Sequence, residues 1–365
     1  MTATDHGLVI GKFLPPHAGH ELLVRTAAAT SRRVSVLVLA HPDEPITLDD
    51  RVAWLRSIVA DLPNVMVAGG MDPHPIGYDS AEVWDLHESA FRAVLATLTA
   101  EPVTAVFSSE PYGAELARRF GATSVEVDPG RTLVPISGTA VRDDHVSAWD
   151  HLAPPVRRGL AQRVVVLGAE STGTTTVSRA LVDALRARGG SHGQTRWVPE
   201  VGRAWTIDKL AVAWAEARLR GGEPPSMDDL DWPSDEFVDI ARAQNAEEDH
   251  HAALGGPVLV CDTDAFTTGI WHERYVGSAS DEVAELARHH PLYLLTHHDG
   301  VPFVQDGIRD GEAIRSWMTE RFVEALTESG RRFVVLEGPL ERRVADALEA
   351  IDAVRPDWSG WTGAG

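Results

Sequence analysis

The sequence of 365 residues contains one cysteine, Cys261, so no disulfide can form within the chain. This favours a reducing compartment, because disulfides belong mainly to oxidising ones. No apolar run approaches the roughly 20 residues that a membrane span requires. The first residues show neither the basic start nor the apolar core of a secretory leader. We therefore predict a cytoplasmic protein without a membrane span.

Positive charge is also scarce. The chain carries 33 basic and 54 acidic residues, which gives a formal net charge of −21. Binding to a nucleic acid duplex usually requires a basic surface, so we predict that nucleic acid is not a partner. Only Lys12 and Lys209 are lysines, and the other basic residues are arginines. Each of these two lysines is therefore a candidate functional residue.

The pattern of the chain predicts two α/β domains. Short β-rich runs alternate with amphipathic stretches, which is typical of parallel, doubly wound sheets. The length favours two domains, and the pattern restarts after Ala153-Pro154-Pro155. We place the boundary at about residue 158, which gives domains 1–158 and 159–365. The predicted strands are 7–13, 33–40, 103–108 and 124–127, then 163–167, 258–262, 292–296 and 332–336. Helical spacing is seen over 21–31 and 81–99, and a surface loop is predicted over 221–233.

The first chemical motif is GKFLPPHAGH, residues 11–20, where an apolar strand turns into a helix. Ligands of open α/β sheets bind at the carboxyl ends of strands, and a helix N-terminus favours phosphate. His17 and His20 can donate hydrogen bonds to one triphosphate, and Lys12 adds a positive charge. Nucleotidyl transfer needs mainly alignment and charge stabilisation, which these groups supply. The alternative is that both histidines are surface residues at a helix start.

A second motif, ISGTAVR over residues 136–142, places hydroxyls and Arg142 at another helix start. Alone, it predicts only helix capping. Together, the two motifs resemble the His-x-Gly-His nucleotidyltransferase superfamily. The resemblance implies a Rossmann-like domain, a divalent metal (usually Mg²⁺) carried with ATP, and direct AMP transfer without a covalent enzyme intermediate. It implies that the triphosphate is bound and stabilised by Lys12, His17, His20 and Arg142. It assigns ATP binding also to Gly11, Phe13, Ser137 and Thr139.

The second domain opens with GAESTGTT, residues 168–175, between a strand and a helix. This matches the phosphate-binding P-loop Gly-x-x-x-x-Gly-Lys-[Ser/Thr] except that Thr174 replaces the lysine. The backbone and the helix N-terminus still predict triphosphate binding, and Thr175 is a candidate Mg²⁺ ligand. Loss of the cation can reduce the rate by about 10²- to 10⁵-fold. The predicted ATP-binding residues are Gly168, Glu170, Ser171, Thr172, Gly173, Thr174, Thr175 and Thr176. The alternative is a Gly/Thr-rich turn without a ligand.

Charged residues after later strands complete the candidate site. Asp262 and Asp264 end an apolar strand, where a nucleotide-binding fold places a metal ligand and a base. Arg309 or Arg315 could close over a phosphate, which makes both candidates for ATP binding. Glu200 and Arg203 follow a short strand and could contact a substrate. For each of these residues the alternative is a solvated side chain at a strand end.

The order of these motifs resembles the bifunctional nicotinamide-mononucleotide adenylyltransferase / ribosylnicotinamide kinase family, the NadR type. The resemblance runs from about residue 7 to residue 336 and includes VFSSEP, DPGRT, PEVGRAW, CDTDAFTT and QDGIR. It implies that one domain makes NAD and pyrophosphate from ATP and nicotinamide mononucleotide, and that the other phosphorylates ribosylnicotinamide with ATP. By position it places Trp84 and Asp85 near the nicotinamide nucleotide. It places Glu200, Arg203, Asp262 and Asp264 near the nucleoside, with Asp262 or Asp264 as base or metal ligand.

Two departures from this family pattern shape the expectations. Some members carry an N-terminal DNA-binding segment; only six residues precede the first predicted strand here, so we predict no repressor role. The missing P-loop lysine leaves three hypotheses: a weak kinase, a full kinase in which Arg309, Arg315 or Lys209 replaces the lysine, or a non-catalytic module that binds ATP or NAD. An adenylyltransferase for a different phosphorylated substrate is a further alternative. The sequence leaves a homo-oligomer open.

Overall fold

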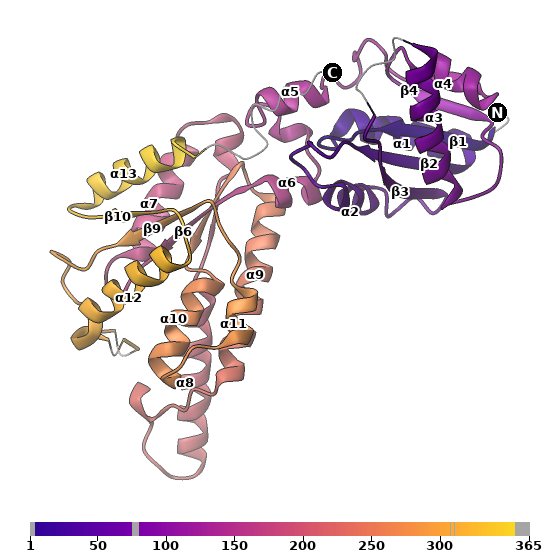
Figure 1. The fold of residues 1–365 in the computed structure, drawn as a ribbon. Helices are drawn as coiled ribbons and strands as arrows, with labels where there is room; N and C mark the ends of the chain where they lie inside the picture. The colour runs from indigo at the N-terminus through magenta and orange to yellow at the C-terminus, as the bar shows by residue number, and fades with distance from the viewer. Residues whose placement is uncertain (1–3, 75–79, 307, 310, 355–365) are drawn as a thin grey trace. The chain divides into compact units, whose positions relative to one another are not determined.

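The computed structural model describes residues 4–74, 80–306, 308–309 and 311–354. The chain separates into two compact units between Gly159 and Leu160, within helix α6 (Pro154–Leu160). Each unit contains a parallel five-stranded sheet (Figure 1). The predicted α/β class with two parallel sheets is therefore confirmed. Within the described residues, no helix has the combination of length and apolar character that a bilayer crossing demands.

The first unit has the strand order β3-β2-β1-β4-β5. This matches five strands of the doubly wound order in which the chain reverses direction beside β1, the switch point where ligands bind. The strands are β1 (Thr4–Gly11), β2 (Ser31–Ala40), β3 (Val65–Met71), β4 (Ala105–Ser108) and β5 (Thr123–Glu126). The helices are α1 (Ala18–Thr30), α2 (Leu48–Ile58), α3 (Ala81–Ala96), α4 (Gly113–Phe120) and α5 (Gly138–Asp143).

Alternating residues of β1 and β2 supply two cores. Val9 and Val36 point to one face and pack with apolar residues of α1 and α2. Leu8 and Leu37 point to the other face and pack with α3 and α4. Since successive strand residues face opposite sides, a continuous apolar run covers both faces of a buried parallel sheet. Both cores fix the carboxyl end of β1, from which the HAGH motif extends.

The second unit has the strand order β10-β9-β6-β8-β7. Its strands are β6 (Gln162–Leu167), β7 (Arg196–Val198), β8 (Val258–Asp262), β9 (Leu292–Thr296) and β10 (Phe333–Leu336). Helices α7 (Thr174–Arg186) and α13 (Leu340–Asp352) pack on one face. Figure 1 shows α8 (Val201–Leu219), α10 (Ala265–Val276) and α11 (Asp281–Leu286) lying together beyond the strands. The remaining helices are α9 (Ser234–Leu254) and α12 (Arg315–Glu328).

Strand β3 is absent from the sequence prediction, and two glycines explain the omission. Glycine is depleted in strands, but here it allows close packing of helices on an edge strand. A Cβ at Gly69 would lie 2.7 Å from a methyl carbon of Val52, and one at Gly70 would lie 2.1 Å from a methyl carbon of Val94. Both positions therefore need glycine so that α2 and α3 can approach β3.

Candidate functional site

The first unit contains a cavity of about 540 Å³ at the carboxyl ends of β1 and β4. It lies at the point where the strand order reverses, as expected for an open α/β sheet. The cavity brings together the two motifs of this domain, which are more than one hundred residues apart in the sequence. All eight residues that we assigned to ATP in this domain line it, namely Gly11, Lys12, Phe13, His17, His20, Ser137, Thr139 and Arg142.

The two histidines form the N-terminal cap of α1. The backbone N–H of Gly19 donates to Nδ1 of His17 over 3.2 Å, and the N–H of His17 donates to Nδ1 of His20 over 3.3 Å. Because each Nδ1 accepts a hydrogen bond, the proton of each neutral imidazole lies on Nε2. The rings stack with their centroids 3.7 Å apart. Both imidazoles can therefore present an Nε2–H donor to one ligand.

Burial keeps these imidazoles neutral. Burial, together with the charges of Arg131, His151 and Arg142, lowers the pKa of His17 to about 4. Burial and the adjacent His17 also lower the pKa of His20 well below its ordinary value. The positive charge at this site therefore comes from the lysine, the arginines and the helix N-terminus, while the histidines contribute oriented dipoles.

Arg142 connects the two motifs. Its Nη1 donates to the carbonyl oxygen of Leu14 over 2.8 Å, and its Nη2 donates to Thr139 Oγ1 over 3.2 Å. Ser137 caps α5 by accepting from the N–H of Ala140. A Cβ at Gly138 would lie 3.2 Å from Arg142 Nη1 and 4.0 Å from His17 Nε2. The start of α5 therefore lies directly beside the histidine donors.

Lys12 is held by a buried pair that the sequence analysis did not identify. Its Nζ lies 3.3 Å from Glu44 Oε1, and the other carboxylate oxygen of Glu44 lies 2.7 Å from Arg51 Nη1. Arg51 also donates to the carbonyl oxygen of Lys12 over 2.9 Å. Glu44 and Arg51 have almost no exposed side-chain surface, whereas the Lys12 side chain is 43% exposed. The pair therefore positions the lysine at the edge of the cavity.

Trp84 and Asp85 do not line this cavity. Trp84 is 6% exposed and belongs to the core under α3, and Asp85 pairs with Arg119 over 2.7 Å on the outer side of that helix. One turn further, His87 does line the cavity, together with Asp72. His87 Nδ1 lies 2.6 Å from Asp72 Oδ2, and both side chains are nearly buried. The helical spacing from Trp84 is a signal that could have identified His87.

Asp72 has an acceptor atom available to a ligand. Its Oδ1 is buried, and within the described part of the chain no hydrogen-bond donor reaches it. A buried carboxylate oxygen without a partner is unfavourable by roughly 1–3 kcal/mol, and more for a charged group. A ligand that donates a hydrogen bond at this position would remove that penalty.

The second unit contains a smaller cavity of about 140 Å³ beside the P-loop. Of the predicted residues, the cavity is lined by Gly168, Glu170, Ser171, Thr174, Thr175, Glu200, Arg203 and Arg309. Trp232, Phe237, Trp271 and Tyr275 add an aromatic wall. Phosphate-binding backbone next to aromatic side chains suits a ligand that has both a phosphate and a flat ring.

Thr175 and Asp262 form the polar centre of this site. Thr175 Oγ1 donates to Asp262 Oδ2 over 2.6 Å, while the buried Asp262 Oδ1 has no partner among the described residues. Burial raises the pKa of Asp262 to about 6, although hydrogen bonds from Thr175 and Thr174 oppose the rise. Burial and the neighbouring Asp262 raise the pKa of Glu200 to about 7. Such raised carboxyl pKa values mark this cluster as a functional candidate.

Asp264 has a different environment from Asp262. It caps α10, where its Oδ1 accepts from the N–H and the hydroxyl of Thr267, and its Oδ2 accepts from the hydroxyl of Tyr293. Both aspartates are buried and neither lines the cavity, but Asp262 accepts from Thr175, which does line it. The structure therefore places the Asp262 carboxylate nearer to the cavity than that of Asp264, whose oxygens are bound within the core.

Two of the three candidate cations for the missing lysine are engaged elsewhere. Lys209 pairs with Glu236 over 2.7 Å on α8 and does not line the cavity. Arg315 donates to the carbonyl oxygens of Val301 and Ser171, over 3.1 and 3.0 Å. Arg309 alone of the three lines the cavity, where its Nη1 donates to the carbonyl oxygen of Val304.

Two arginines stabilise the backbone of the P-loop by hydrogen bonds to its carbonyl oxygens. Arg315 reaches the carbonyl oxygen of Ser171, and the buried Arg343 donates to that of Thr172 over 2.8 Å. A Cβ at Gly168 would lie 2.3 Å from Thr296 Oγ1, so this turn requires glycine. Thr172 and Gly173 support the loop without lining the cavity, and Thr176 is exposed. The loop is therefore shaped in advance of any ligand.

Backbone strain concentrates at the two cavities. The described residues include five non-glycine residues with positive φ, and every one of them lines a cavity. Phe13, Asp128 and Arg131 belong to the first cavity, and Ser171 and Thr263 to the second. Left-handed backbone is unfavourable by about 1–3 kcal/mol per residue and clusters at functional sites.

Comparison with known proteins places these sites in context. A family model described as an AAA domain matches residues 163–343. The trifunctional NAD biosynthesis/regulator protein NadR of Salmonella typhimurium is 25% identical over 366 residues, which cover 94% of this chain and 82% of that protein. The chain is similar to NadR proteins over most of its length.

Two solved structures extend the likeness to the fold. A NadR protein in complex with NR has a TM-score of 0.68 and 19% identity, and covers 97% of this chain and 98% of its own. A NadR protein in complex with NAD and AMP-PNP has the same TM-score at 20% identity, with 98% of each chain covered. The NadR fold therefore extends over both units, and the predicted resemblance to the NadR type is confirmed.

Proposed function

We propose that the first unit transfers AMP from ATP to nicotinamide mononucleotide, which yields NAD and pyrophosphate. The observation that carries this proposal is the convergence of two Nε2–H donors, from His17 and His20, with Arg142 in one cavity. In this reaction a phosphate oxygen of the mononucleotide attacks the α-phosphorus of ATP, and pyrophosphate leaves. The enzyme must align the two phosphates and stabilise the added negative charge, which these donors are arranged to do.

We propose further that Asp72 and His87 select nicotinamide over nicotinate. The buried Asp72 Oδ1 can accept a hydrogen bond from the amide of nicotinamide. The carboxylate of nicotinate would instead meet a carboxylate in a desolvated site, and such a like-charge contact costs several kcal/mol. The ratio of kcat/KM for the amide and acid mononucleotides tests this step. Asp72→Asn should lower that ratio at least tenfold, and an unchanged ratio would refute the assignment.

For the second unit we propose binding of ATP and ribosylnicotinamide, with slow phosphoryl transfer. The P-loop backbone and the aromatic wall support binding, and the Thr174 position supports a low rate. Asp262 and Thr175 fit the Mg²⁺ that the family implies, because Asp262 Oδ1 is a buried acceptor without a described partner. Bound Mg²⁺ would neutralise phosphate charge. The relatives solved with NR and with NAD plus AMP-PNP support this choice of ligands.

A binding module is the second candidate for this unit. The specific observation in its favour is that Arg315 and Lys209 are both bound elsewhere, which leaves Arg309 and Arg203 as the cations that line the cavity. A domain with a preshaped phosphate loop and a weak transfer centre would act as a sensor of ATP or NAD.

A paired turnover assay with ATP and Mg²⁺ tests these proposals. One reaction contains nicotinamide mononucleotide and the other contains ribosylnicotinamide. NAD from the first with only slow conversion in the second is the expected result. Rapid formation of product in both reactions would show that another cation replaces the lysine. Tight binding of ATP by the second unit without phosphorylation of ribosylnicotinamide would favour the binding module. No product in either reaction would refute the nicotinamide assignment and leave an adenylyltransferase for another phosphorylated substrate.

A further inference from the structure

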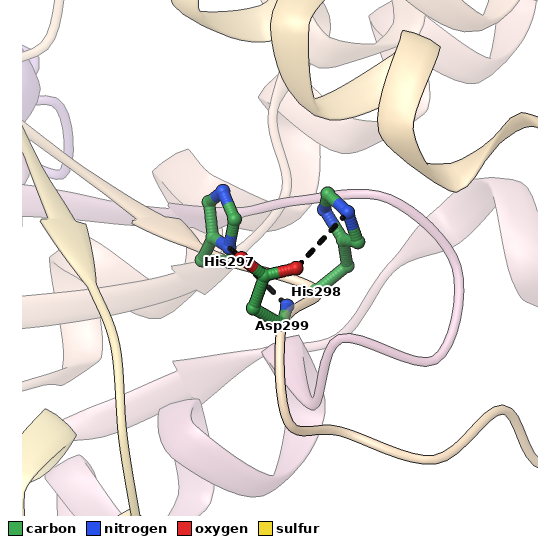
Figure 2. Close-up of side chains that lie close together, drawn as sticks. All are labelled: His297, His298 and Asp299. Carbon is green, nitrogen blue, oxygen red and sulfur yellow. Dashed lines mark hydrogen bonds and ion pairs between the residues drawn. The ribbon is translucent and has the colours of Figure 1, made fainter.

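Three ligand-type side chains converge directly after β9, outside both cavities. Figure 2 shows His297, His298 and Asp299 turned toward one another. His297 Nδ1 lies 3.5 Å from Asp299 Oδ2, and His298 Nε2 lies 3.4 Å from Asp299 Oδ1. The two imidazole rings are stacked, with their centroids 4.6 Å apart. One ligand atom from each residue falls within 4.8 Å of the other two.

The surrounding hydrogen bonds fix the proton of His298. Its Nδ1 lies 2.9 Å from Thr319 Oγ1. The hydroxyl proton of Thr319 is already donated to the carbonyl oxygen of Arg315, over 2.9 Å. Thr319 Oγ1 must therefore accept from His298, which places the ring proton on Nδ1 and a lone pair on Nε2. That lone pair belongs to the nitrogen nearest the Asp299 carboxylate.

His297 presents a second lone pair to the same carboxylate. Its Nδ1 accepts a weak hydrogen bond, 3.2 Å long, from the backbone N–H of Asp299. Nδ1 is therefore the unprotonated nitrogen of the neutral ring. Two ring nitrogens and a carboxylate therefore lie close together, and each can offer a lone pair to one central point. A cation at that point would interact favourably with all three groups.

We propose that His297, His298 and Asp299 bind a divalent transition-metal ion of the Zn²⁺ class. Imidazole nitrogen and carboxylate oxygen are ligands that Zn²⁺, Co²⁺ and Ni²⁺ accept, whereas Mg²⁺ prefers oxygen. Bonds of about 2.0–2.2 Å in a tetrahedron place neighbouring ligand atoms roughly 3.4 Å apart. Two nitrogen–oxygen pairs here, to different oxygens of Asp299, are separated by 3.5 and 3.4 Å, and the three ligand atoms lie within 4.8 Å of one another, so a bound metal would draw them slightly closer together. Water would fill the fourth position, and the metal would replace the weak hydrogen bond at His297 Nδ1.

Thr319 fixes the orientation of the His298 ring by accepting a hydrogen bond from it. A metal-bound histidine generally donates its other ring N–H to an oxygen, which fixes the ring and its tautomer. Thr319 does this for His298 from α12, and its side chain is buried. The site therefore combines an exposed carboxylate with a histidine that is oriented by the interior of the domain.

The backbone of the metal site is tied to the P-loop. Arg343 donates to the carbonyl oxygens of His297 and Thr172, over 3.1 and 2.8 Å. Arg315 donates to the carbonyl oxygen of Ser171 and, over 3.5 Å, to that of His298. Arg315 and Arg343 therefore bind both the P-loop and residues 297–299, so a metal ion that orders residues 297–299 would affect the P-loop through these two arginines. Coupling of this kind must be reciprocal, so nucleotide binding would alter metal affinity equally.

Titration of the full chain with Co²⁺ tests the proposal, because Co²⁺ reports its coordination by visible absorption. The chain is first stripped with a chelator and kept free of nucleotide, and Zn²⁺ is then used to displace the Co²⁺. Wild type should bind one equivalent of Co²⁺ that is absent from the double variant His297→Ala/His298→Ala. Asp299→Asn, at a residue whose side chain is 80% exposed, should weaken that equivalent at least tenfold without disturbing folding.

Two further variants separate metal binding from general effects. Thr319→Val should lower the affinity about 10- to 100-fold and shift the Co²⁺ spectrum, because it releases the His298 ring. His250→Ala removes an exposed histidine from another adjacent pair, on α9, and should leave the titration unchanged. Equal binding by wild type and the double variant would overturn the proposal. Loss of the same equivalent in His250→Ala would overturn it as well, because the binding would then not be specific to this cluster.

Discussion

If the second unit transfers phosphate as proposed, a lysine at the P-loop position should raise the rate of that transfer. Thr174 is the first residue of α7, lines the second cavity and lies within hydrogen-bonding reach of Asp262. Thr174→Lys would place a full positive charge at the phosphate position. One such cation on a transferring phosphoryl group accounts for about 10² to 10⁵ in rate. Because Arg203 and Arg309 already line the cavity, we expect the lower end, about 100-fold in kcat, which corresponds to ~2.7 kcal/mol.

The new charge should also change the pH profile. Burial raises the pKa of Asp262 to about 6, so at lower pH this carboxyl becomes protonated and is a poorer ligand for Mg²⁺, and activity should fall. A lysine next to the carboxylate favours its ionised form and lowers the pKa. The acidic limb of the Thr174→Lys profile should therefore lie at lower pH than that of wild type.

The assay is phosphoryl transfer from ATP to ribosylnicotinamide, with kcat and KM measured separately between pH 5 and 8. Adenylyl transfer by the first unit serves as the internal control for folding. Thr174→Met is the matched variant, because methionine has similar length and no charge. If Thr174→Lys gains no more than Thr174→Met, the missing cation does not limit this unit, and the reasoning from the P-loop fails.

Three further predictions concern single side chains. His20→Ala should lower kcat for adenylyl transfer by about 10² or more, through loss of one phosphate donor, and retention of activity within a few-fold would contradict the assigned site. Burial and Asp262 raise the pKa of Glu200 to about 7 from 4.5, so the native state binds this proton more tightly and stability falls as the pH rises through that window. Glu200→Gln should remove this decrease in the free energy of unfolding, which is at most about 3 kcal/mol. The measurement is thermal melting at pH 5 and pH 8, and a variant that keeps the wild-type difference between the two melting temperatures would count against the prediction. Gly168→Ala should abolish ATP binding by the second unit, because its Cβ would lie 2.3 Å from Thr296 Oγ1; unchanged ATP affinity by calorimetry would show that the loop can move.

Local patterns predicted much of the fold and several of the residues that lie together at each cavity. Apolar runs next to turn residues located both central strands, β1 and β6, since a buried parallel strand has no other sequence signature. The convergence of His17 with Arg142 was also predictable, because motifs at the carboxyl ends of parallel strands meet at one edge of the sheet. The same logic brought Thr175 to Asp262.

The sequence did not predict which groups distant in the chain each polar side chain contacts in the fold. Arg315 was a candidate phosphate ligand, but it donates to backbone carbonyl oxygens, and nothing in the sequence distinguishes these two uses of a guanidinium group. The sequence likewise does not show that Arg51 and Arg343 donate to backbone carbonyl oxygens. His87 and Asp72 were missed because their pairing depends on β3, the strand that two glycines concealed. Asp262 and Asp264 look equivalent in sequence, yet helix capping separates their roles.

Thermal engineering of this protein would be limited by the left-handed residues at the two cavities. Glycine in place of Phe13 would relieve about 1–2 kcal/mol of backbone strain. The Phe13 side chain is only 1% exposed and packs in the core beside β1, and removal of a buried phenylalanine costs about 3–5 kcal/mol. The packing of this side chain therefore maintains the strained backbone that carries it. A screen for heat resistance should not recover glycine at this position, and Phe13→Gly should melt at a lower temperature than wild type.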